Sequence, residues 1–205
     1  MPPDAFDPRP ITLTGRFVRL EPLSETHVEA LVEVAANKGI FRYFPMQIDT
    51  ADEVRAYLGH CLAGLKFGDT ITFATISLAE DRPVGTTTFL AIDRANRRLE
   101  IGGTWLAPDW QRTACNTEAK YLQMRHAFED LGAVRVEFKT DSLNERSRAA
   151  LTRIGAVEEG TMRNHIIVPG PRHRHSVYFS VIDSEWPSVK ARLEEMLAKY
   201  GQPSA

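Results

Sequence analysis

Along this chain, segments with an apolar residue at every second position alternate with segments with one at every third or fourth position. This alternation restricts the folds available to the chain. Residues 11–21 and 134–140 alternate apolar and polar side chains, as half-buried strands do. Residues 50–65 and 117–131 carry an apolar residue every three or four positions, which predicts amphipathic helices. The predicted strands are 11–21, 70–79, 83–92, 97–106, 134–140, 157–168 and 173–183. The predicted helices follow Ser24, run from about Thr50 to Leu65 and from about Thr117 to Leu131, follow Asn144 as far as Gly155, and cover about 184–199.

This order mixes hairpins with strand–helix units. It predicts an α/β (α+β) fold, in which a twisted, mostly antiparallel mixed sheet carries helices on both faces. The chain has 205 residues and no long Gly/Ser linker or repeat, which favours one domain. Four prolines in the first ten residues predict a flexible lead-in over residues 1–10. We expect the domain to cover residues 11–200 and a short tail to cover residues 201–205.

Composition and missing motifs exclude several classes of function. A net charge of −2 argues against a nucleic-acid partner, which needs clustered lysine and arginine. No apolar run approaches the roughly 18 residues of a membrane span. We see no secretory signal, and two cysteines fit a reducing compartment, so we expect a cytoplasmic protein. The dinucleotide fingerprint, the phosphate loop of nucleotide hydrolases, the zinc-protease motif and the serine-hydrolase elbow are all missing.

The stretch from Thr104 to Ala119 is where the sequence points to a ligand. A predicted strand ends there, a short polar loop follows, and a helix then begins. The N-terminus of a helix offers free amide N–H groups and the positive end of the helix dipole. Asn116 and Thr117 are suitable N-cap residues, and we expect the helix to begin beside them. On these residues alone, the segment predicts a phosphate site.

The residue types of this loop make the prediction of a phosphate site more specific. Residues 111–116 read Gln-Arg-Thr-Ala-Cys-Asn, which resembles the acyl-CoA pyrophosphate loop Gln/Arg-x-x-Gly-x-Gly/Ala of the GNAT superfamily of N-acetyltransferases. Further segments are similar to the branch with the ribosomal-protein N-terminal (alanine/serine) acetyltransferases, and the resemblance covers about residues 11–185. These segments are 99–102, 117–119, 144–147, 153–156 and 159–163.

Two loop positions depart from the family pattern. Ala114 stands where the family has its first glycine, and Asn116 stands at the second small position. A methyl group at position 114 is expected to crowd the pyrophosphate, or to strain the backbone if φ is positive there. Asparagine tolerates the left-handed conformation better than most residues, so position 116 raises less concern.

The resemblance implies an enzyme of the GNAT fold that moves an acetyl group from acetyl-CoA to a primary amine. In this family the amine attacks the thioester directly in a ternary complex, and no metal takes part. The implied acceptor is a protein or peptide N-terminus, or a small molecule. The implied cofactor-binding residues are Trp105, Leu106, Ala107, Gln111, Arg112, Thr113, Ala114, Cys115, Asn116, Thr117 and Asn144.

Two residues are candidates for the general base that deprotonates the amine. Glu100 leads, because the resemblance places it on the strand that faces the acceptor. The alternative is a structural ion pair between Glu100 and Arg97 or Arg98. Some relatives place a glutamate on the penultimate strand instead, where this chain has Ile166. His165 beside it is therefore the second candidate, and its alternative is a surface histidine.

The remaining catalytic roles fall on a helix start and a strand amide. Ser147 matches the position that returns a proton to the leaving thiolate, and its alternative is to help Asn144 cap the helix. Asn144 contacts the cofactor or an ordered water in the family, or is a cap only. The amide near Leu106 would polarise the acetyl carbonyl beside a bulge that Gly102 and Gly103 predict. The alternative is a bulge without a catalytic role.

For several other residues, the sequence allows both a functional and a structural interpretation. Cys115 precedes a predicted helix N-terminus, which can lower a thiol pKa, and we interpret it as a loop residue. Trp105 and Trp110 are core or cofactor-covering aromatics. The run 172–175 is a solvated hairpin or an anion-attracting rim of the acceptor pocket, while a metal site there is the weakest alternative. Phe41, Tyr43 and Phe44 form the walls of that pocket or belong to the core.

Two other classes of function remain open at this stage. Ala114 and the missing glutamate at Ile166 are compatible with a catalytically silent acyl-CoA sensor. A protein-interaction domain that kept only the fold is the other class. The sequence leaves the oligomeric state open, and a homodimer is one state that the resemblance implies.

Overall fold

The computed structural model describes residues 6–36, 38–68 and 70–201. Residues 1–5 of the expected lead-in and residues 202–205 of the expected tail lie outside the described residues. Within the expected lead-in, Phe6 is 3% exposed and belongs to the main apolar core.

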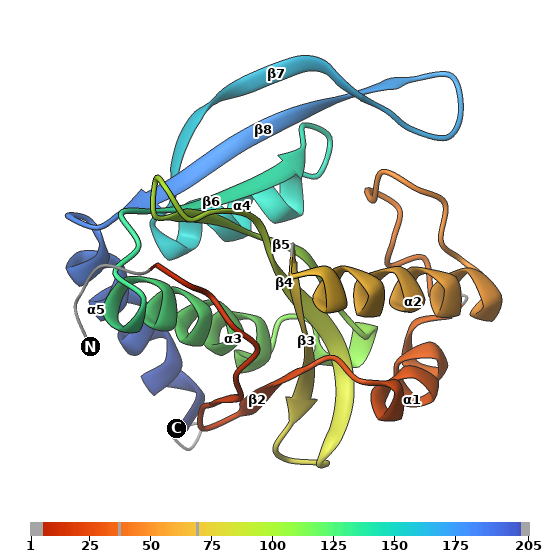
Figure 1. The fold of residues 1–205 in the computed structure, drawn as a ribbon, viewed down its shortest axis with the longest axis horizontal. Helices are drawn as coiled ribbons and strands as arrows, with labels where there is room; N and C mark the ends of the chain where they lie inside the picture. Colours follow the sequence, from red (N-terminus) through yellow and green to blue (C-terminus); the bar gives the residue numbers. More distant parts are fainter. Residues whose placement is uncertain (1–5, 37, 69, 202–205) are drawn as a thin grey trace.

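The centre of the molecule is one twisted sheet of eight strands (Figure 1). Their spatial order is β1-β2-β3-β4-β5-β6-β8-β7. Every neighbouring pair is antiparallel except β5 and β6, which are parallel. The strands are β1 (Leu13–Thr14), β2 (Val18–Pro22), β3 (Ile71–Ser77), β4 (Arg82–Asp93), β5 (Arg98–Leu106), β6 (Arg135–Asp141), β7 (Val157–Ile167) and β8 (His173–Ile182).

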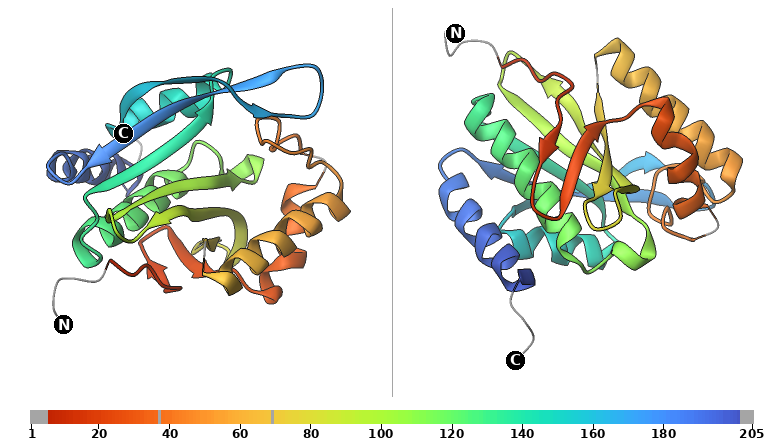
Figure 2. Two further views of the ribbon diagram at one scale, coloured as in Figure 1. Left: turned by 45° about the horizontal axis from the view of Figure 1, so that its top comes forward. Right: turned by 90° about the horizontal axis from the view of Figure 1, so that it is seen from below.

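Helices cover both faces of this sheet, as Figure 2 shows in two further views. One face carries α1 and α2, and the other carries α3, α4 and α5. In the described part of the chain, none of the helices combines the length and apolar character needed to cross a bilayer. The helices are α1 (Glu25–Ala35), α2 (Ala51–Phe67), α3 (Ala114–Arg125), α4 (Glu145–Ile154) and α5 (Trp186–Ala198), with short 3-10 helices at Pro108–Trp110 and Lys199–Gly201.

The parallel pair β5–β6 is the most important feature of the sheet for function. Its register joins only Arg98–Glu100 to Arg135–Glu137. Both strands continue well past this point, β5 to Leu106 and β6 to Asp141. Their backbones therefore separate beyond Glu100 and Glu137, and we call the space between them the β5–β6 gap.

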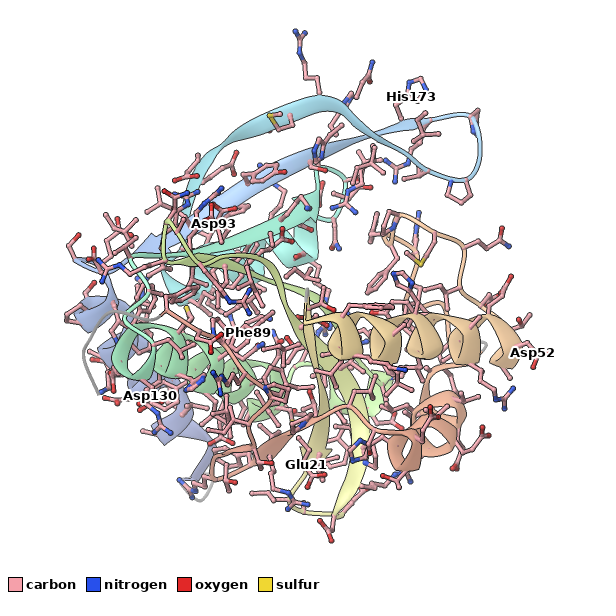
Figure 3. All side chains as sticks on the ribbon, in the orientation of Figure 1. Glu21, Asp52, Phe89, Asp93, Asp130 and His173 are labelled. Carbon is pink, nitrogen blue, oxygen red and sulfur yellow. The ribbon has the colours of Figure 1, made fainter. Side chains whose placement is uncertain are left out.

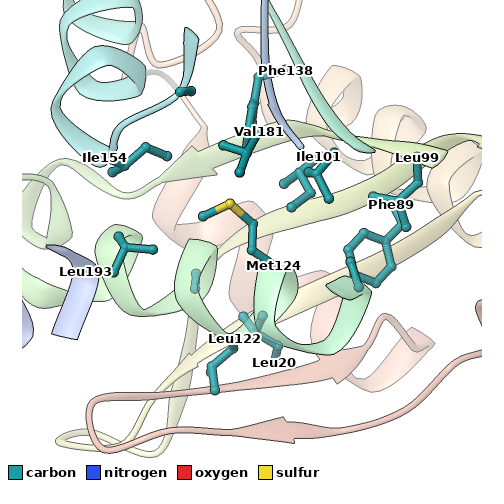
Figure 4. Packing of buried hydrophobic residues seen from close by; sticks show 14 of the residues in the cluster. Leu20, Phe89, Leu99, Ile101, Leu122, Met124, Phe138, Ile154, Val181 and Leu193 are labelled. Atoms are coloured by element: carbon teal, nitrogen blue, oxygen red, sulfur yellow. The ribbon is translucent and has the colours of Figure 1, made fainter. Parts of the chain in front are cut away.

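Two apolar clusters hold the helices to the sheet. The larger lies under α3, α4 and α5, and Figure 4 shows ten labelled members, among them Leu99 and Ile101 of β5 and Phe138 of β6. The smaller lies under α1 and α2 and includes Leu31, Leu58 and Trp105. Every labelled residue in Figure 4 is buried. Apolar side chains therefore fill the face of the sheet under α3 on both sides of the β5–β6 gap.

Helix α3 is tied to the first hairpin by a buried carboxylate. Glu118 accepts hydrogen bonds from the backbone amides of Arg16, Phe17 and Val18 at 2.6–2.8 Å. A β-carbon at Gly15 would lie 2.4 Å from the Glu118 carboxyl carbon, so only glycine leaves room for this contact. The turn at Gly15 also explains why the predicted strand 11–21 is two strands, β1 and β2.

The predicted fold class is confirmed, and two element boundaries are corrected. The helix predicted from about Thr117 begins at Ala114, because Thr113 is its N-cap. Asn116 and Thr117 are therefore not caps and lie in the first turn of the helix. The α-helix ends at Arg125 and continues as a π-helix over His126–Asp130 before Gly132 turns left-handed at φ 68°.

Candidate active site

The loop between β5 and α3 is held in shape by its own side chains. The Gln111 amide nitrogen donates to the Leu106 carbonyl at 2.8 Å, and Arg146 of α4 donates to the Gln111 side-chain oxygen at 2.7 Å. Thr113 donates its hydroxyl to the Trp110 carbonyl at 2.8 Å. Gln111 thus joins the end of β5 to the start of α4 and fixes the loop between them.

The positive φ that would strain the backbone at Ala114 falls on another residue of the loop. Ala114 is the first residue of α3, and the positive φ of the loop falls on Arg112, at 65°. The condition for strain at Ala114, a positive φ, is therefore not met, and a helical residue accepts a methyl group without strain. The Arg112 side chain is exposed beside the N-terminus of α3, where Arg146 is also exposed.

The first turn of α3 presents backbone rather than side chains to a ligand. Thr113 caps the helix by accepting a hydrogen bond from the Cys115 amide at 3.3 Å. Cys115 and Thr117 are 3% and 1% exposed, so their side chains point into the protein. Burial raises the pKa of the Cys115 thiol, which is opposite to the lowering that its position suggested. An α-helix leaves its first amides without acceptors, so this turn with two flanking arginines is suited to a diphosphate.

A bulge in β5 adjoins the loop, where the glycine pair predicts it. Thr88 pairs with Gly102 and Thr86 with Trp105, so two residues of β5 oppose one residue of β4. Gly103 has φ 55°, which is the left-handed conformation of a bulge that begins with glycine. The bulge reverses which face each following residue of β5 points to, up to Leu106 at the strand end.

One face of the sheet next to the β5–β6 gap carries buried charge. Glu100 is 5% exposed, and its carboxylate accepts a hydrogen bond from Lys139 of β6 at 3.1 Å. Its partner is therefore Lys139 and not Arg97 or Arg98, the residues of the structural alternative. Gly102 keeps space for this carboxylate, because a β-carbon there would lie 2.9 Å from a Glu100 oxygen.

The second base candidate lies on the same face as Glu100. His165 of β7 is half-buried, with Nδ1 3.0 Å from the Ser176 hydroxyl and its ring edge-on to Tyr178. Lys139 lies over that Tyr178 ring at 5.8 Å, which connects the two candidates through one aromatic side chain. His165 is thus not an isolated surface histidine.

The start of α4 lies at the end of β6. Asn144 is the N-cap and accepts a hydrogen bond from the Ser147 amide at 3.0 Å, so it caps α4 whether or not it also contacts the cofactor. The Ser147 side chain is half-buried in the same turn. Through Arg146 this turn also contacts Gln111, which brings the predicted acid and the predicted cofactor loop together.

Aromatic residues fill the space on the α1–α2 side of β5. Phe41 lies edge-on to Trp105 at 5.3 Å and to Phe44 at 5.1 Å. Trp105 is 4% exposed and Phe41 is 3% exposed, so the core interpretation holds for both side chains. The Trp105 side chain is therefore turned away from the cofactor loop, and Trp110 packs against the larger cluster.

A buried lysine lies under the bulge, where sequence reasoning did not place one. Lys120 of α3 is 6% exposed and donates to the hydroxyls of Thr104 at 2.7 Å and Thr87 at 3.2 Å. Its nitrogen is 6.0 Å from the Phe138 ring centre, so it lies between β5 and β6. Burial alone lowers the pKa of Lys120 to about 7.

Comparisons with known proteins agree with this geometry. The model of the acetyltransferase (GNAT) domain family matches residues 18–157, which is more than half of the chain. The chain belongs to the GNAT acetyltransferase family. It is an acetyltransferase, and enzymes of this family use acetyl-CoA.

Individual relatives of this GNAT chain support the same assignment. A GCN5-related N-acetyltransferase structure from Brucella melitensis is 32% identical with a TM-score of 0.88, covering 98% of this chain and 91% of that one. YdaF of Bacillus subtilis, a candidate ribosomal N-acetyltransferase, is 37% identical over 99 residues, which are 48% of this chain and 53% of YdaF. RimJ of Mycobacterium smegmatis, solved with CoA-disulfide, shares the fold at 22% identity, with a TM-score of 0.76 and coverage of 91% and 95%.

Several residues of this GNAT site were missed by sequence reasoning. Glu118 and Lys120 lie in a helix that packs on several sides, so its polar residues cannot be assigned to a solvated face by periodicity. Lys139 comes close to Glu100 only when β6 is placed beside β5. The one available signal was the alternation in residues 134–140, which puts Lys139 on the face opposite to the apolar core.

Proposed function

We propose that this enzyme transfers the acetyl group of acetyl-CoA to a primary amine by direct attack, with a peptide N-terminus or a small molecule as the acceptor. The observation that carries the proposal is the position of Glu100. It is a buried carboxylate at the last paired residue of β5, where the β5–β6 gap opens. A base there is next to the space that both substrates would have to share.

The cofactor loop supplies the binding groups. The amides in the first turn of α3, with the Arg112 and Arg146 side chains beside them, would hold the diphosphate of acetyl-CoA. Gln111, Thr113 and Asn144 act through the hydrogen bonds that fix the loop and the start of α4. Trp105, Ala107, Ala114, Cys115, Asn116 and Thr117 would contribute backbone atoms or shape rather than charge.

Acetyl-CoA supplies the acetyl group as a thioester, and the chain supplies the proton transfers around it. Glu100 would accept the proton of the attacking amine, with His165 as the second candidate. The backbone amide at Leu106 would stabilise the charge that develops on the carbonyl oxygen. The Ser147 hydroxyl would return a proton to the leaving sulfur.

Calorimetric titration with acetyl-CoA, followed by assays on amidated peptides and on small amines, tests this proposal. We expect stoichiometric acetyl-CoA binding at micromolar concentration, no binding of ATP at matched concentration, and release of free CoA only when an amine is present. Absence of binding to any CoA species would contradict the proposal.

A further inference from the structure

The hairpin β7–β8 forms one edge of the sheet, and its tip extends to the segment that links α1 to α2. Figures 1 and 2 show its tip beside that segment from two directions. Arg174 makes the contact, because its Nη1 donates to the Tyr43 carbonyl at 3.3 Å. The hairpin and the α1–α2 segment are therefore in contact through Arg174.

Five charged residues lie near one another on the face of the sheet that carries Glu100, and we call this group the charged face. Val177, Phe179 and Val181 of β8 point into the larger apolar cluster, so Arg174, Ser176 and Tyr178 point to the opposite face, the one that carries Glu100. Figure 3 shows the side chains of this region below the hairpin, with His173 labelled near its tip. The charged face consists of Glu100, Lys139, Asp141, Arg172 and Arg174.

Both carboxylates of the charged face already have cationic partners. Lys139 donates to Glu100 at 3.1 Å, and Arg172 donates to Asp141 at 2.5 Å. The Asp141 side chain has no exposed surface, and its other oxygen accepts the Leu143 amide at 3.0 Å. Three cations thus face two carboxylates, and Arg174 is the cation left over.

Arg174 is buried without the partners that a guanidinium needs. It is 6% exposed, its Nε has no hydrogen-bond acceptor, and within the described ranges no carboxylate forms an ion pair with it. Burial lowers the pKa of Arg174, although Asp141 and Glu100 act in the opposite direction. A guanidinium has five N–H donors in a planar fork that matches a carboxylate. A buried charge of this kind is unfavourable until a counter-ion binds.

We propose that Arg174 binds a carboxylate of the acceptor, so that the enzyme acetylates amines that carry a nearby acidic group. This inference rests on the proposed function and adds the chemical class of the acceptor. An acceptor with one carboxylate on Arg174 would place its amine beside Glu100 and balance the excess cation. The carboxylate comes either from an acidic side chain near a peptide N-terminus or from the C-terminus of a short peptide.

Paired acceptors that differ in one carboxylate test the inference. Amidated hexapeptides with Ser at the first position and Glu or Gln at the second form one pair, and Ser-Ala with a free or amidated C-terminus forms the other. Wild-type kcat/KM should be at least about tenfold higher for the acidic member of one pair, and the pair that responds identifies the source of the carboxylate. Arg174→Gln should reduce this preference to less than about twofold, and Arg174→Lys should leave an intermediate preference.

The matched control is Arg163→Gln, which removes an exposed arginine from the same hairpin and should keep the wild-type preference. Arg174→Gln should also unfold at a temperature no lower than that of the wild type, because it removes an uncompensated buried charge. A clear loss of thermal stability would instead show that Arg174 has a structural role. Equal rates on both members of both pairs would overturn the inference and leave the acetyltransferase proposal intact.

A binding measurement separates failure of this inference from failure of the proposed function. The N-acetylated product of the preferred acidic acceptor is titrated into protein saturated with free CoA. The wild type should bind it at least about tenfold more tightly than Arg174→Gln does. Such a difference without acetyl transfer to any amine would support the carboxylate site and contradict the proposed function. Equal affinity for wild type and variant would overturn the site.

Discussion

The charged side chains of this site differ in the hydrogen-bond and ion-pair partners that lie within their reach. Glu100 and Arg174 are both buried on one face of the sheet, but Glu100 has Lys139 as a partner and Arg174 has one backbone carbonyl. Lys120 on the other side of β5 has two threonine hydroxyls and no carboxylate partner among the described residues. These differences arise from strand register and could not be read from residue type.

Removing the proposed base should affect catalysis without affecting cofactor binding. Glu100→Gln keeps the shape of the side chain and loses the proton acceptor, so we expect kcat to fall by about 10²-fold or more while the acetyl-CoA affinity stays unchanged. Steady-state kinetics and calorimetry measure the two effects separately. Glu137→Gln is the matched control, since Glu137 pairs with Glu100 in the parallel ladder but accepts its hydrogen bonds from Arg98 and Arg135, and it should retain kcat. A rate within a few-fold of the wild type for Glu100→Gln would exclude it as the base.

The buried Lys120 should make stability depend on pH in a defined direction. Its pKa falls from 10.5 to about 7 on folding, so between these pH values the unfolded chain binds the proton and the folded chain does not. Wild-type stability relative to Lys120→Met should therefore rise with pH, by ~1 kcal/mol per pH unit between pH 7.5 and 9.5. Urea unfolding at several pH values measures this slope. The exposed Lys66→Met should show no such slope, and a flat difference for Lys120→Met would contradict a neutral buried amine.

At the scale of elements, the order and type of the strands and helices followed from periodicity and capping residues. Ser24 and Asn144 are N-caps where the sequence predicts them, and the helix predicted from about Thr50 has Thr50 as its N-cap. The start of α3 was predicted three residues late, because Asn116 and Thr117 are good caps by residue type and Thr113 is one too. Only the hydrogen bonds of Thr113 to Trp110 and Cys115 decide among them. The partner of Glu100 was missed for a similar reason, since Lys139 is distant in sequence.

The contact between α3 and the first hairpin should contribute strongly to stability. Glu118→Gln replaces one of the two carboxylate oxygens with a donor that faces the backbone amides of residues 16–18, so we expect the free energy of unfolding to fall by ~2–3 kcal/mol. Urea denaturation measures this loss. Glu195→Gln on the exposed side of α5 makes the same chemical change and should alter stability by less than ~0.5 kcal/mol. A similarly small loss for Glu118→Gln would show that the three amide contacts are not important for folding.

At the scale of the whole molecule, one sheet separates two apolar clusters. Phe73 belongs to the larger cluster and its neighbour Ala74 to the smaller, so adjacent residues of β3 support opposite sides. Neither side can lose its packing without exposing the same strands. The domain should therefore unfold as one cooperative unit.

Two tryptophans report on the two clusters separately. Trp105 lies in the smaller cluster and Trp186 in the larger. In a Trp110→Phe background, we compare a variant that keeps only Trp105 with a variant that keeps only Trp186. The two should give the same urea midpoint after correction for the stability change that each tryptophan substitution causes. Adding Leu193→Ala should lower both midpoints together. Leu193 is fully buried in the larger cluster, and its truncation should cost ~2–5 kcal/mol. A lower midpoint for Trp186 alone would show that the two sides unfold independently.

The short β5–β6 ladder divides the sheet into two parts, or plates: strands β1 to β5 and strands β6, β8 and β7. The three residue pairs of this ladder form the only backbone connection between neighbouring strands of the two plates in the described residues, and we call them the hinge. Three residue pairs of backbone contact stabilise that hinge only weakly, so its angle depends on the packing of Leu99 and Ile101 against Phe138 above Met124 of α3. The volume of these core side chains therefore sets how far apart the free edges of the plates stand. Reactivity at the open edge is in this way adjustable by residues that never contact a substrate.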